Sequence, residues 1–361
     1  MKTTKAMRII SCILGVILLF GCLAGCGGTG TKEPKDNSGS GDKTVYKLKI
    51  DYPNPENSAI YPVLVKWAEW CGEKSDGRLD IKIYSGGALG SIMDCVSNCE
   101  AGVTDGFWSA MNLYPGIWPL CDVFMLPMLG AKGVEAQDAA IQEMMQKEEF
   151  ASQFDNVHLV AIASSTPASF IFANEATSMK DVNGVTVRSF SNYASPWLKS
   201  LGAVPVSVSS NDGYESLSKN VVGGGLWYLD QIQSSALYEV IKTCFYGEMC
   251  YPALFLALNK DVYAGLPEDL QKVIDESADY YLSLTQPAYF QQEDEVFALL
   301  KEHNVKVYDI SAEDSAWLTE HAQAGWDVFN ESVGKLGYDG QKYIDELRET
   351  IAKYNKEFYG E

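Results

Sequence analysis

The stretch that decides the fold is residues 45–84, VYKLKIDYPNPENSAIYPVLVKWAEWCGEKSDGRLDIKIY. Residues 45–51 alternate apolar and polar side chains, and residues 79–84 do so again, which is typical of strands with one buried face. Between them, Asn57 or Ser58 is placed to cap a helix that has one apolar face. A strand, a helix and a second strand in this order predict a βαβ unit, whose two strands pair in parallel.

The same alternation continues along the chain. From Pro267 the pattern becomes almost wholly helical, and residues 269–300 predict one long helix that contains Pro287. This order predicts an α/β fold with open, mainly parallel sheets, in which ligands bind at the carboxyl ends of the strands. Further strands are expected at 103–109, 157–163, 170–174, 185–188, 204–208 and 253–258, and further helices at 91–101, 134–150 and 192–201.

A targeting segment occupies residues 1–25. Its first residues are basic, residues 9–22 are apolar but too short to cross a membrane as a helix, and LAGC follows at residues 23–26. This arrangement resembles the lipobox of bacterial lipoproteins, which implies that Cys26 is acylated and becomes the new N-terminus. An ordinary secretory signal or a signal anchor is the alternative. Residues 26–43 predict a flexible tether that holds the folded part near the cell membrane, outside the cytoplasm.

Composition and charge argue against several function classes. The formal charge of −20 supplies no basic face for nucleic acid. The chain has only three His and contains no Walker A, GxGxxG, GxSxG or HExxH motif. We therefore expect no cofactor, no metal and no enzymatic activity. The Cys residues beyond Cys26 are either disulfide-bonded, which export permits, or buried free thiols, which we favour because domains of this size do not need disulfides.

One arginine is a candidate ligand-binding residue. Arg188 follows the apolar strand residues 185–187, whereas Arg78 and Arg348 occupy ordinary surface contexts. A guanidinium at a strand end can bind a carboxylate through two parallel hydrogen bonds. From the residues alone, a surface Arg paired with a nearby acid is the alternative.

Four motifs occur in order around this arginine: DVNGVTVR at residues 181–188, LGAVP at 201–205, Tyr214 with Leu217, and VVGG at 221–224. Together they resemble the pattern of the solute-binding proteins of TRAP transporters, the DctP family. The resemblance extends over most of the chain beyond the tether. It is moderately specific, because several unlike residues match at consistent spacing.

The resemblance implies a fold class more definite than the strand and helix pattern gives. It is an α/β fold of the type II periplasmic-binding-protein kind, with two α/β domains, a ligand cleft between them and a long connecting helix. The implied domain I comprises residues 44–164 plus about 252–286, and the implied domain II comprises residues 165–251 plus about 287–361.

The resemblance also implies a function and partners. Family members capture a small organic acid, with the Arg that matches Arg188 on the ligand carboxylate, and deliver it to the small and large integral membrane subunits of an ion-driven transporter. Two other function classes stay open. One is a lipid-anchored receptor of an ABC importer with the same general fold. The other is a surface enzyme, which is disfavoured because no nucleophile, base and orienting group can be named.

Two departures from the family pattern shape the expected ligand. Many members carry a second Arg about 20 residues before the first, but residues 165–169 of this chain contain none, and Gly223 replaces a usual Asp. A second carboxylate would lack a partner, so the pattern favours a monocarboxylate with an apolar or aromatic body. We expect that body to stack on Trp227, Tyr228 or Trp108, for each of which core packing is the alternative.

Overall fold

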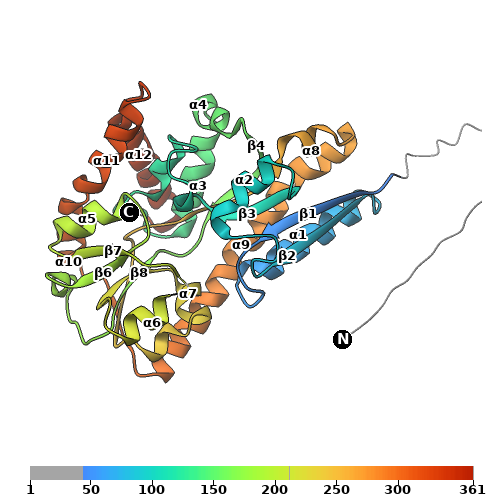
Figure 1. The fold of residues 1–361 in the computed structure, drawn as a ribbon. Coiled ribbons are helices and arrows are strands. Elements are labelled where there is room, and N and C mark those ends of the chain that lie inside the picture. The colour runs from blue at the N-terminus through green and yellow to red at the C-terminus, as the bar shows by residue number, and fades with distance from the viewer. Residues whose placement is uncertain (1–43, 211, 361) are drawn as a thin grey trace, which may run out of the picture. The chain divides into compact units, whose positions relative to one another are not determined.

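The computed structural model describes residues 44–210 and 212–360, which form two β-sheets surrounded by helices (Figure 1). Sheet A has the strand order β2-β1-β3-β10-β4, and sheet B has the order β11-β9-β5-β8-β6-β7. The strands of sheet A are β1 (Tyr46–Tyr52), β2 (Leu79–Ser85), β3 (Gly106–Ala110), β4 (Val157–Ser164) and β10 (Ala253–Asn259). Those of sheet B are β5 (Ser169–Phe172), β6 (Thr186–Ser189), β7 (Val204–Ser207), β8 (Gly224–Trp227), β9 (Thr243–Tyr246) and β11 (Lys306–Asp309). The predicted α/β class is confirmed.

The first βαβ unit forms as expected, with β1 and β2 paired in parallel along their whole length. Helix α1 (Ile60–Lys74) connects them and buries Trp67 against the sheet, and the chain leaves the helix through left-handed backbone at Gly77. The predicted cap is wrong: Ala59 occupies the N-cap position without a side-chain hydrogen bond. The Ser58 hydroxyl is used elsewhere, in a 2.5 Å hydrogen bond with the hydroxyl of Tyr52.

Both sheets are mainly parallel, as predicted, but each contains one antiparallel strand that was not predicted. Strand β10 runs antiparallel to β3 and β4, and β5 runs antiparallel to β8 and β9. The reason is the path of the chain, which crosses from sheet A to sheet B after Ser164 and returns after Tyr246. Each crossing begins at the carboxyl end of a strand. The first strand after the crossing therefore starts where the parallel strands of the other sheet end, and it runs in the opposite direction to them.

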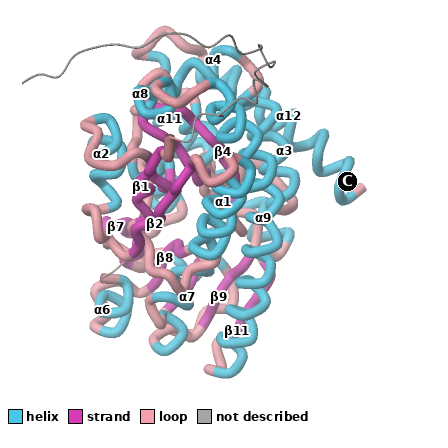
Figure 2. Tube along the Cα trace, turned by 90° about the vertical axis from the view of Figure 1, so that its right-hand side faces the viewer, coloured by secondary structure: helices cyan, strands magenta, loops and turns pink. Residues whose placement is uncertain are grey.

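Helix α9 (Glu268–Glu302) is the predicted long helix, and it contains Pro287. Its first half packs on α1 and β4, and its second half packs on α7 (Leu229–Ser234) and β11, so one helix contacts both sheets (Figures 1 and 2). Pro287 has no backbone N–H to donate within the helix. This helix therefore connects the elements of sheet A with those of sheet B.

The remaining helices are packed around the two sheets, and several of them contribute to the core that joins the sheets. Their bounds are α2 (Cys95–Glu100), α3 (Val134–Met145), α4 (Glu148–Ala151), α5 (Ala194–Ser200), α6 (Gly213–Ser218), α8 (Lys260–Ala264), α10 (Ala312–His321), α11 (Gln323–Gly334) and α12 (Gly340–Tyr359). Short 3₁₀ helices are η1 (Ile92–Asp94), η2 (Met111–Leu113), η3 (Cys121–Met125), η4 (Ser152–Phe154), η5 (Met179–Val182) and η6 (Leu237–Glu239). Helix α12 packs on α3, and α11 packs on α5, so the C-terminal helices contact elements from both halves of the chain.

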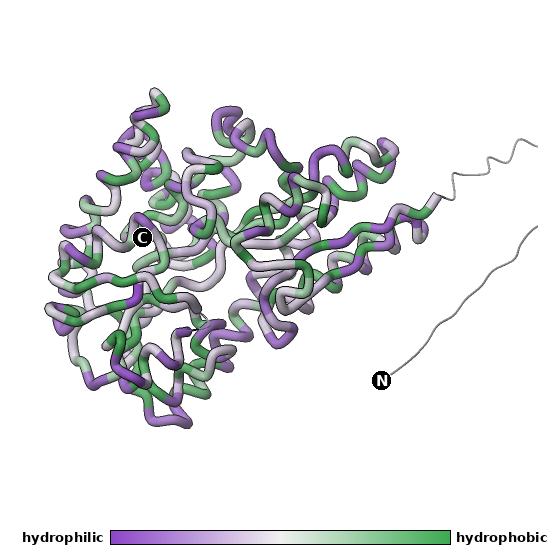
Figure 3. Tube along the Cα trace, in the orientation of Figure 1, coloured by the Kyte–Doolittle hydropathy of each residue, from purple (hydrophilic) through white to green (hydrophobic). Residues whose placement is uncertain are grey.

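Apolar side chains are concentrated in the strands, and hydrophilic segments lie along the peripheral helices (Figure 3). The largest core joins the two sheets, because it contains Phe107 and Phe255 of sheet A together with Phe170 and Leu226 of sheet B. The six described cysteines are all buried free thiols, which confirms the favoured interpretation.

Within the described residues, no helix has the length and apolar character needed to cross a membrane. The predicted signal segment, the tether and Cys26 lie outside the described residues.

Candidate ligand-binding site

Arg188 lies on β6, one residue before the end of the strand. Strand β6 pairs in parallel with β7 and with β8, where Gly225 is the partner of Arg188. Gly225 has a φ of +146°, and a Cβ atom there would lie 2.6 Å from the Arg188 backbone nitrogen and oxygen. Glycine is required at this position, because β8 approaches β6 too closely for any side chain. The glycine-rich motif therefore holds the backbone of Arg188 in place.

Three hydrogen bonds to the protein fix the guanidinium of Arg188. Its Nε donates to the Val208 carbonyl at 2.9 Å, its Nη1 to the Leu226 carbonyl at 2.5 Å and its Nη2 to the Ser210 hydroxyl at 3.1 Å. A guanidinium carries five N–H donors, so one N–H on each terminal nitrogen has no protein acceptor among these bonds. Two such donors match the two oxygens of a carboxylate.

The guanidinium is buried without an acidic partner. Arg188 is 4% exposed, and no carboxylate of the described residues forms an ion pair with it. Aromatic rings flank it instead: the Trp227 ring centre lies 4.7 Å from the guanidinium carbon, and that of Phe190 lies 5.9 Å away. Burial lowers the pKa of Arg188 to about 10, so the group stays charged at neutral pH. An unpaired buried cation is costly, and a bound anion would remove that cost.

A second charged group, Asp230, lies close to this cation in the first turn of α7. Burial raises the pKa of its carboxyl to about 6, against the lowering effect of backbone N–H donors and of the Arg188 charge. Asp230 also raises the pKa of Tyr52, at the end of β1, and of Tyr289, on α9. The charge of Asp230 therefore acts on titratable groups of β1 and α9 as well as on Arg188.

A cluster of aromatic side chains connects sheet A with α9. Tyr52 packs edge-on against Trp108 with ring centres 5.1 Å apart, and Trp108 Nε1 donates to the Tyr281 hydroxyl at 3.0 Å. All three side chains are buried, as is Tyr289. These groups carry both apolar surface and hydroxyl groups, which suits contact with the body of an organic molecule.

The structure brings three of the four predicted ligand-binding residues together. Trp227 stacks on the guanidinium of Arg188, and Tyr228 packs against Phe190, with ring centres 5.1 Å apart. Trp108 lies apart from them, with Tyr52 and Tyr281 on the sheet A side. A contact between any of these aromatic rings and a ligand stays a prediction.

Sequence reasoning missed Asp230, Ser210 and Tyr52. The only signal for Asp230 was an acid placed two residues after an aromatic pair that follows a strand. The Ser210 hydroxyl could not be placed from the sequence, because it is far from Arg188 along the chain. It accepts from Arg188 Nη2 and, at 3.0 Å, from the Gln231 side-chain amide.

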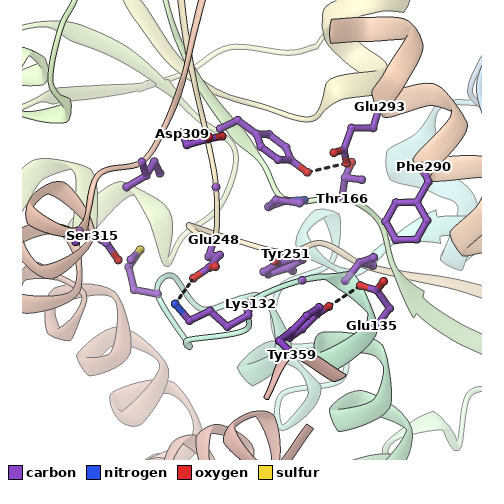
Figure 4. Close-up of a pocket in the computed structure, with 18 of the residues that line it drawn as sticks. Lys132, Glu135, Thr166, Glu248, Tyr251, Phe290, Glu293, Asp309, Ser315 and Tyr359 are labelled. Carbon is purple, nitrogen blue, oxygen red and sulfur yellow. Dashed lines mark hydrogen bonds and ion pairs between the residues drawn. The ribbon is translucent and has the colours of Figure 1, made fainter. Parts of the chain in front are cut away.

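A cavity of about 760 Å³ lies elsewhere, beside the two chain crossings between the sheets (Figure 4). It is lined by parts of α3, α9 and β11, by the two crossings and by the end of α12, and none of the four predicted residues contributes to it. Three of its four carboxylates have printed partners: Glu293 accepts from the Tyr246 hydroxyl at 2.7 Å, Glu135 accepts from that of Tyr359 at 2.6 Å, and Glu248 lies 3.6 Å from Lys132 Nζ.

No cluster of three or more potential metal ligands occurs among residues 44–210 and 212–360. The site described around Arg188 is thus an assembly of one guanidinium, one carboxylate, hydroxyl groups and aromatic rings. Such an assembly can bind a polar organic molecule by complementary charge.

Comparison with known families agrees with this geometry. The family model for DctP, described as bacterial extracellular solute-binding protein, family 7, matches residues 51–332. The chain belongs to this family. The match confirms the family that the motifs around Arg188 indicated, and it makes the protein a solute-binding receptor of the TRAP type.

Two curated relatives of this DctP protein cover most of its length. The 2,3-diketo-L-gulonate-binding periplasmic protein of Escherichia coli is 20% identical over 307 residues, which are 83% of this chain and 92% of that protein. The ectoine-binding periplasmic protein of Halomonas elongata is 21% identical over 292 residues, which are 78% of this chain and 83% of that protein.

Solved structures share the fold. A TRAP solute-binding protein from a marine metagenome, specific for aromatic acid ligands and crystallised with 3-hydroxybenzoate, is 24% identical, with a TM-score of 0.79 over 87% of this chain and 100% of that chain. A TRAP solute-binding protein from Rhodoferax ferrireducens, in complex with copurified benzoate, is 23% identical, with a TM-score of 0.74 over 86% of this chain and 99% of that chain. The predicted type II periplasmic-binding fold is confirmed.

Proposed function

We propose that this DctP protein captures a small organic acid by its carboxylate, which Arg188 holds through two parallel hydrogen bonds. The observation that carries the proposal is the buried guanidinium of Arg188, which has two N–H donors and no acidic partner in the described part of the chain. A ligand carboxylate supplies both the missing charge and the missing acceptors. The protein binds and releases this acid without chemical change, so it is a receptor and not an enzyme.

The ligand is a monocarboxylate with an apolar or aromatic body. Arg188 is the only guanidinium on the sheet B side of the site in the described residues, so a second carboxylate has no comparable partner. Trp227, Tyr228 and Trp108 offer aromatic surface for the body. Two structural neighbours bind 3-hydroxybenzoate and benzoate, which are aromatic monocarboxylates. Another neighbour binds β-D-galacturonate, so the fold itself also accepts sugar acids.

The experiment that tests this function starts with the protein as purified. Gentle denaturation followed by mass spectrometry identifies any ligand that copurifies, and calorimetry then compares benzoate, 3-hydroxybenzoate, mandelate, succinate, malate and galacturonate. We expect the monocarboxylates with an aromatic body to bind most tightly. A clear preference for succinate or malate would contradict the proposed ligand class.

We further propose that Cys26 anchors the receptor to the outer side of the cell membrane, where it delivers the acid to the small and large membrane subunits of a TRAP transporter. The LAGC sequence at residues 23–26 supports lipidation. Two or more acyl chains bury many methylenes at about 0.8 kcal/mol each, which is enough for stable anchoring. Cys26→Ala should leave the protein in the soluble fraction or unprocessed. Membrane attachment of that variant at the wild-type level would refute the anchor.

We also propose that the ligand closes two domains, residues 44–164 plus about 252–286 and residues 165–251 plus about 287–361, by bending α9 near Pro287. All strands of sheet A fall in the first set and all strands of sheet B fall in the second, which supports this division. Small-angle scattering should give a smaller radius of gyration with bound ligand than without it. An unchanged radius would count against domain closure but not against carboxylate binding.

A further inference from the structure

Two amide oxygens near Arg188 are buried and have no hydrogen-bond partner. They are Oδ1 of Asn112 and Oε1 of Gln231, and no described residue donates to either of them. The large majority of buried polar atoms in folded proteins have a partner, so each exception needs a physical explanation. The two residues belong to different sheets, and each is connected to the surroundings of Arg188 by a hydrogen bond.

Gln231 lies in the first turn of α7, and its side chain is part of the hydrogen-bond network of Arg188. The Gln231 side-chain amide donates to the Ser210 hydroxyl at 3.0 Å, and the same hydroxyl accepts from Arg188 Nη2 at 3.1 Å. Nη2 also carries one of the two N–H donors that the protein leaves to a ligand. One hydroxyl group therefore separates the Gln231 amide from the nitrogen that we assign to the ligand carboxylate.

Asn112 approaches the end of β6 from the other sheet. It lies in η2, directly after β3, and its amide nitrogen donates to the Phe190 carbonyl at 3.3 Å. Phe190 directly follows β6, and its ring centre lies 5.9 Å from the guanidinium carbon of Arg188. A carbonyl group only accepts hydrogen bonds, so this contact fixes the orientation of the Asn112 amide. The amide oxygen is then the atom without a partner.

The hydrogen bonds that the site leaves unmade describe the ligand. Arg188 offers two N–H donors, which a carboxylate satisfies, but a plain carboxylate has no donor for the two amide oxygens. A hydroxyl group supplies such a donor and adds no charge. An ammonium group would add a second cation beside Arg188, and neutral amide oxygens compensate a buried charge less well than a carboxylate does.

We infer that Gln231 and Asn112 are specificity-determining residues, whose amide oxygens accept from a hydroxyl group of the ligand. The site then takes a hydroxy acid, with its carboxylate on Arg188 and at least one hydroxyl group on an apolar or aromatic body. This inference rests on the proposed function, which it narrows from monocarboxylates in general to hydroxy monocarboxylates.

The test compares acids that share a carbon skeleton and differ in one group. The first set is benzoate with its 2-, 3- and 4-hydroxy derivatives, and the second is phenylacetate, mandelate and phenylglycine. Calorimetry measures their affinities for the wild-type protein, for Gln231→Met, for Asn112→Leu and for the control Gln233→Met. Gln233 also lies on α7, but its amide oxygen has a protein donor, the Gln292 amide at 3.5 Å. Circular dichroism checks that all variants are folded.

We expect a hydroxy acid of at least one set to bind the wild-type protein about 10-fold or more tightly than its unsubstituted parent. This ratio should fall to about 3-fold or less in Gln231→Met or in Asn112→Leu, because an apolar side chain of similar size offers no acceptor. It should not change in Gln233→Met. If Gln231 and Asn112 only held Ser210 and Phe190 in position, parent and hydroxy acid would lose affinity equally and the ratio would stay the same.

Parent acids that bind as tightly as their hydroxy derivatives, or a ratio that neither variant changes, would overturn the inference. Tighter binding of phenylglycine than of mandelate would overturn the choice of a hydroxyl group. Carboxylate capture by Arg188 would survive both outcomes, since its own test is the loss of affinity in Arg188→Ala. If none of these acids binds, the copurified ligand decides. It supports the inference only if it carries a hydroxyl group and loses about 10-fold or more in affinity in one of the two variants, and any other result overturns it.

Discussion

The surroundings of Arg188 and the cavity of Figure 4 both lie where strands end, but they differ in whether their charged side chains have partners in the protein. The cavity is large, at about 760 Å³, and its acids Glu135, Glu248 and Glu293 each have a tyrosine or lysine partner. Around Arg188 the protein buries a cation and gives it only neutral acceptors. A charge that the protein leaves unpaired indicates a ligand more directly than an open volume does, because burial without a partner costs free energy that only binding recovers.

The largest expected effect is the loss of Arg188. Truncating one partner of a buried charge pair costs about 2 to 5 kcal/mol, so Arg188→Ala should weaken binding of the ligand by roughly 30-fold to several thousand-fold. Arg188→Lys should recover only part of the loss, because an ammonium cannot present two parallel donors. Calorimetry with the copurified ligand measures both variants, and circular dichroism checks that they are folded. Wild-type affinity in Arg188→Ala would show that the unpaired guanidinium does not hold the ligand. The surroundings of Arg188 would then be no better a candidate site than the cavity.

A buried acid on α3 allows a test of how burial acts on a carboxyl group. Asp138 on α3 accepts from the Ser164 backbone N–H and, at 2.8 Å, from the Gln286 side-chain amide. Burial raises the pKa of its carboxyl from 3.8 to about 7. The folded protein then retains a proton that the unfolded chain has lost, so this group lowers the free energy of unfolding as the pH rises from about 4 to about 7.

In Asp138→Asn this pH dependence should disappear, because the amide does not titrate and its oxygen can still accept from Ser164. Between pH 4 and pH 8 the free energy of unfolding should shift in favour of the variant by up to about 4 kcal/mol relative to the wild type. Urea unfolding of both proteins at pH 5, 6, 7 and 8 measures the shift. Parallel pH profiles would show that burial does not raise the pKa of Asp138.

Local patterns of the sequence predicted the βαβ unit, the long helix α9 and the strand that ends at Arg188, because each has a clear period of apolar residues. They did not predict the antiparallel directions of β5 and β10. Both strands read as buried apolar runs, and such runs contain no information on direction. The direction follows from the two crossings between the sheets, which are tertiary features. Strand β11 was missed because its short run, Lys306–Asp309, is largely exposed.

The candidate site was predicted in part for the same reason. Arg188 could be found because few arginines occur in the chain and one of them ends an apolar strand. The partners of its guanidinium could not be found, since Val208, Ser210 and Leu226 reach it only through the pairing of β7 and β8 with β6. The surroundings of Asp230 could not be predicted either, because Tyr52 and Tyr289, whose pKa values it raises, are distant from it in sequence.

A smaller effect is expected from the ring that stacks on the guanidinium. Trp227 is fully buried, and its ring centre lies 4.7 Å from the guanidinium carbon of Arg188. A cation–π contact contributes about 0.5 to 2 kcal/mol, so Trp227→Leu should weaken binding of every carboxylate by roughly 3-fold or more. If the ring also contacts the ligand, aromatic acids should lose more affinity than aliphatic acids of similar size. Calorimetry with benzoate and isocaproate compares the two losses. Equal losses would show that the ring holds the guanidinium but does not contact the ligand.

The smallest effect on ligand affinity is expected from substitutions in the cavity. They serve as the control for the Arg188 test. Glu293→Gln retains an acceptor for the Tyr246 hydroxyl while it removes a carboxylate whose pKa burial raises. Because the cavity shares no residue with the Arg188 surroundings, the affinity for the ligand should change by less than about 3-fold. Tyr246→Phe, which leaves the charge and removes the hydrogen bond, should behave in the same way. A loss of 10-fold or more in Glu293→Gln, with Tyr246→Phe unchanged, would mean that the charge of the cavity acts on ligand binding. An unpaired cation would then no longer be sufficient to identify the recognition site of this fold.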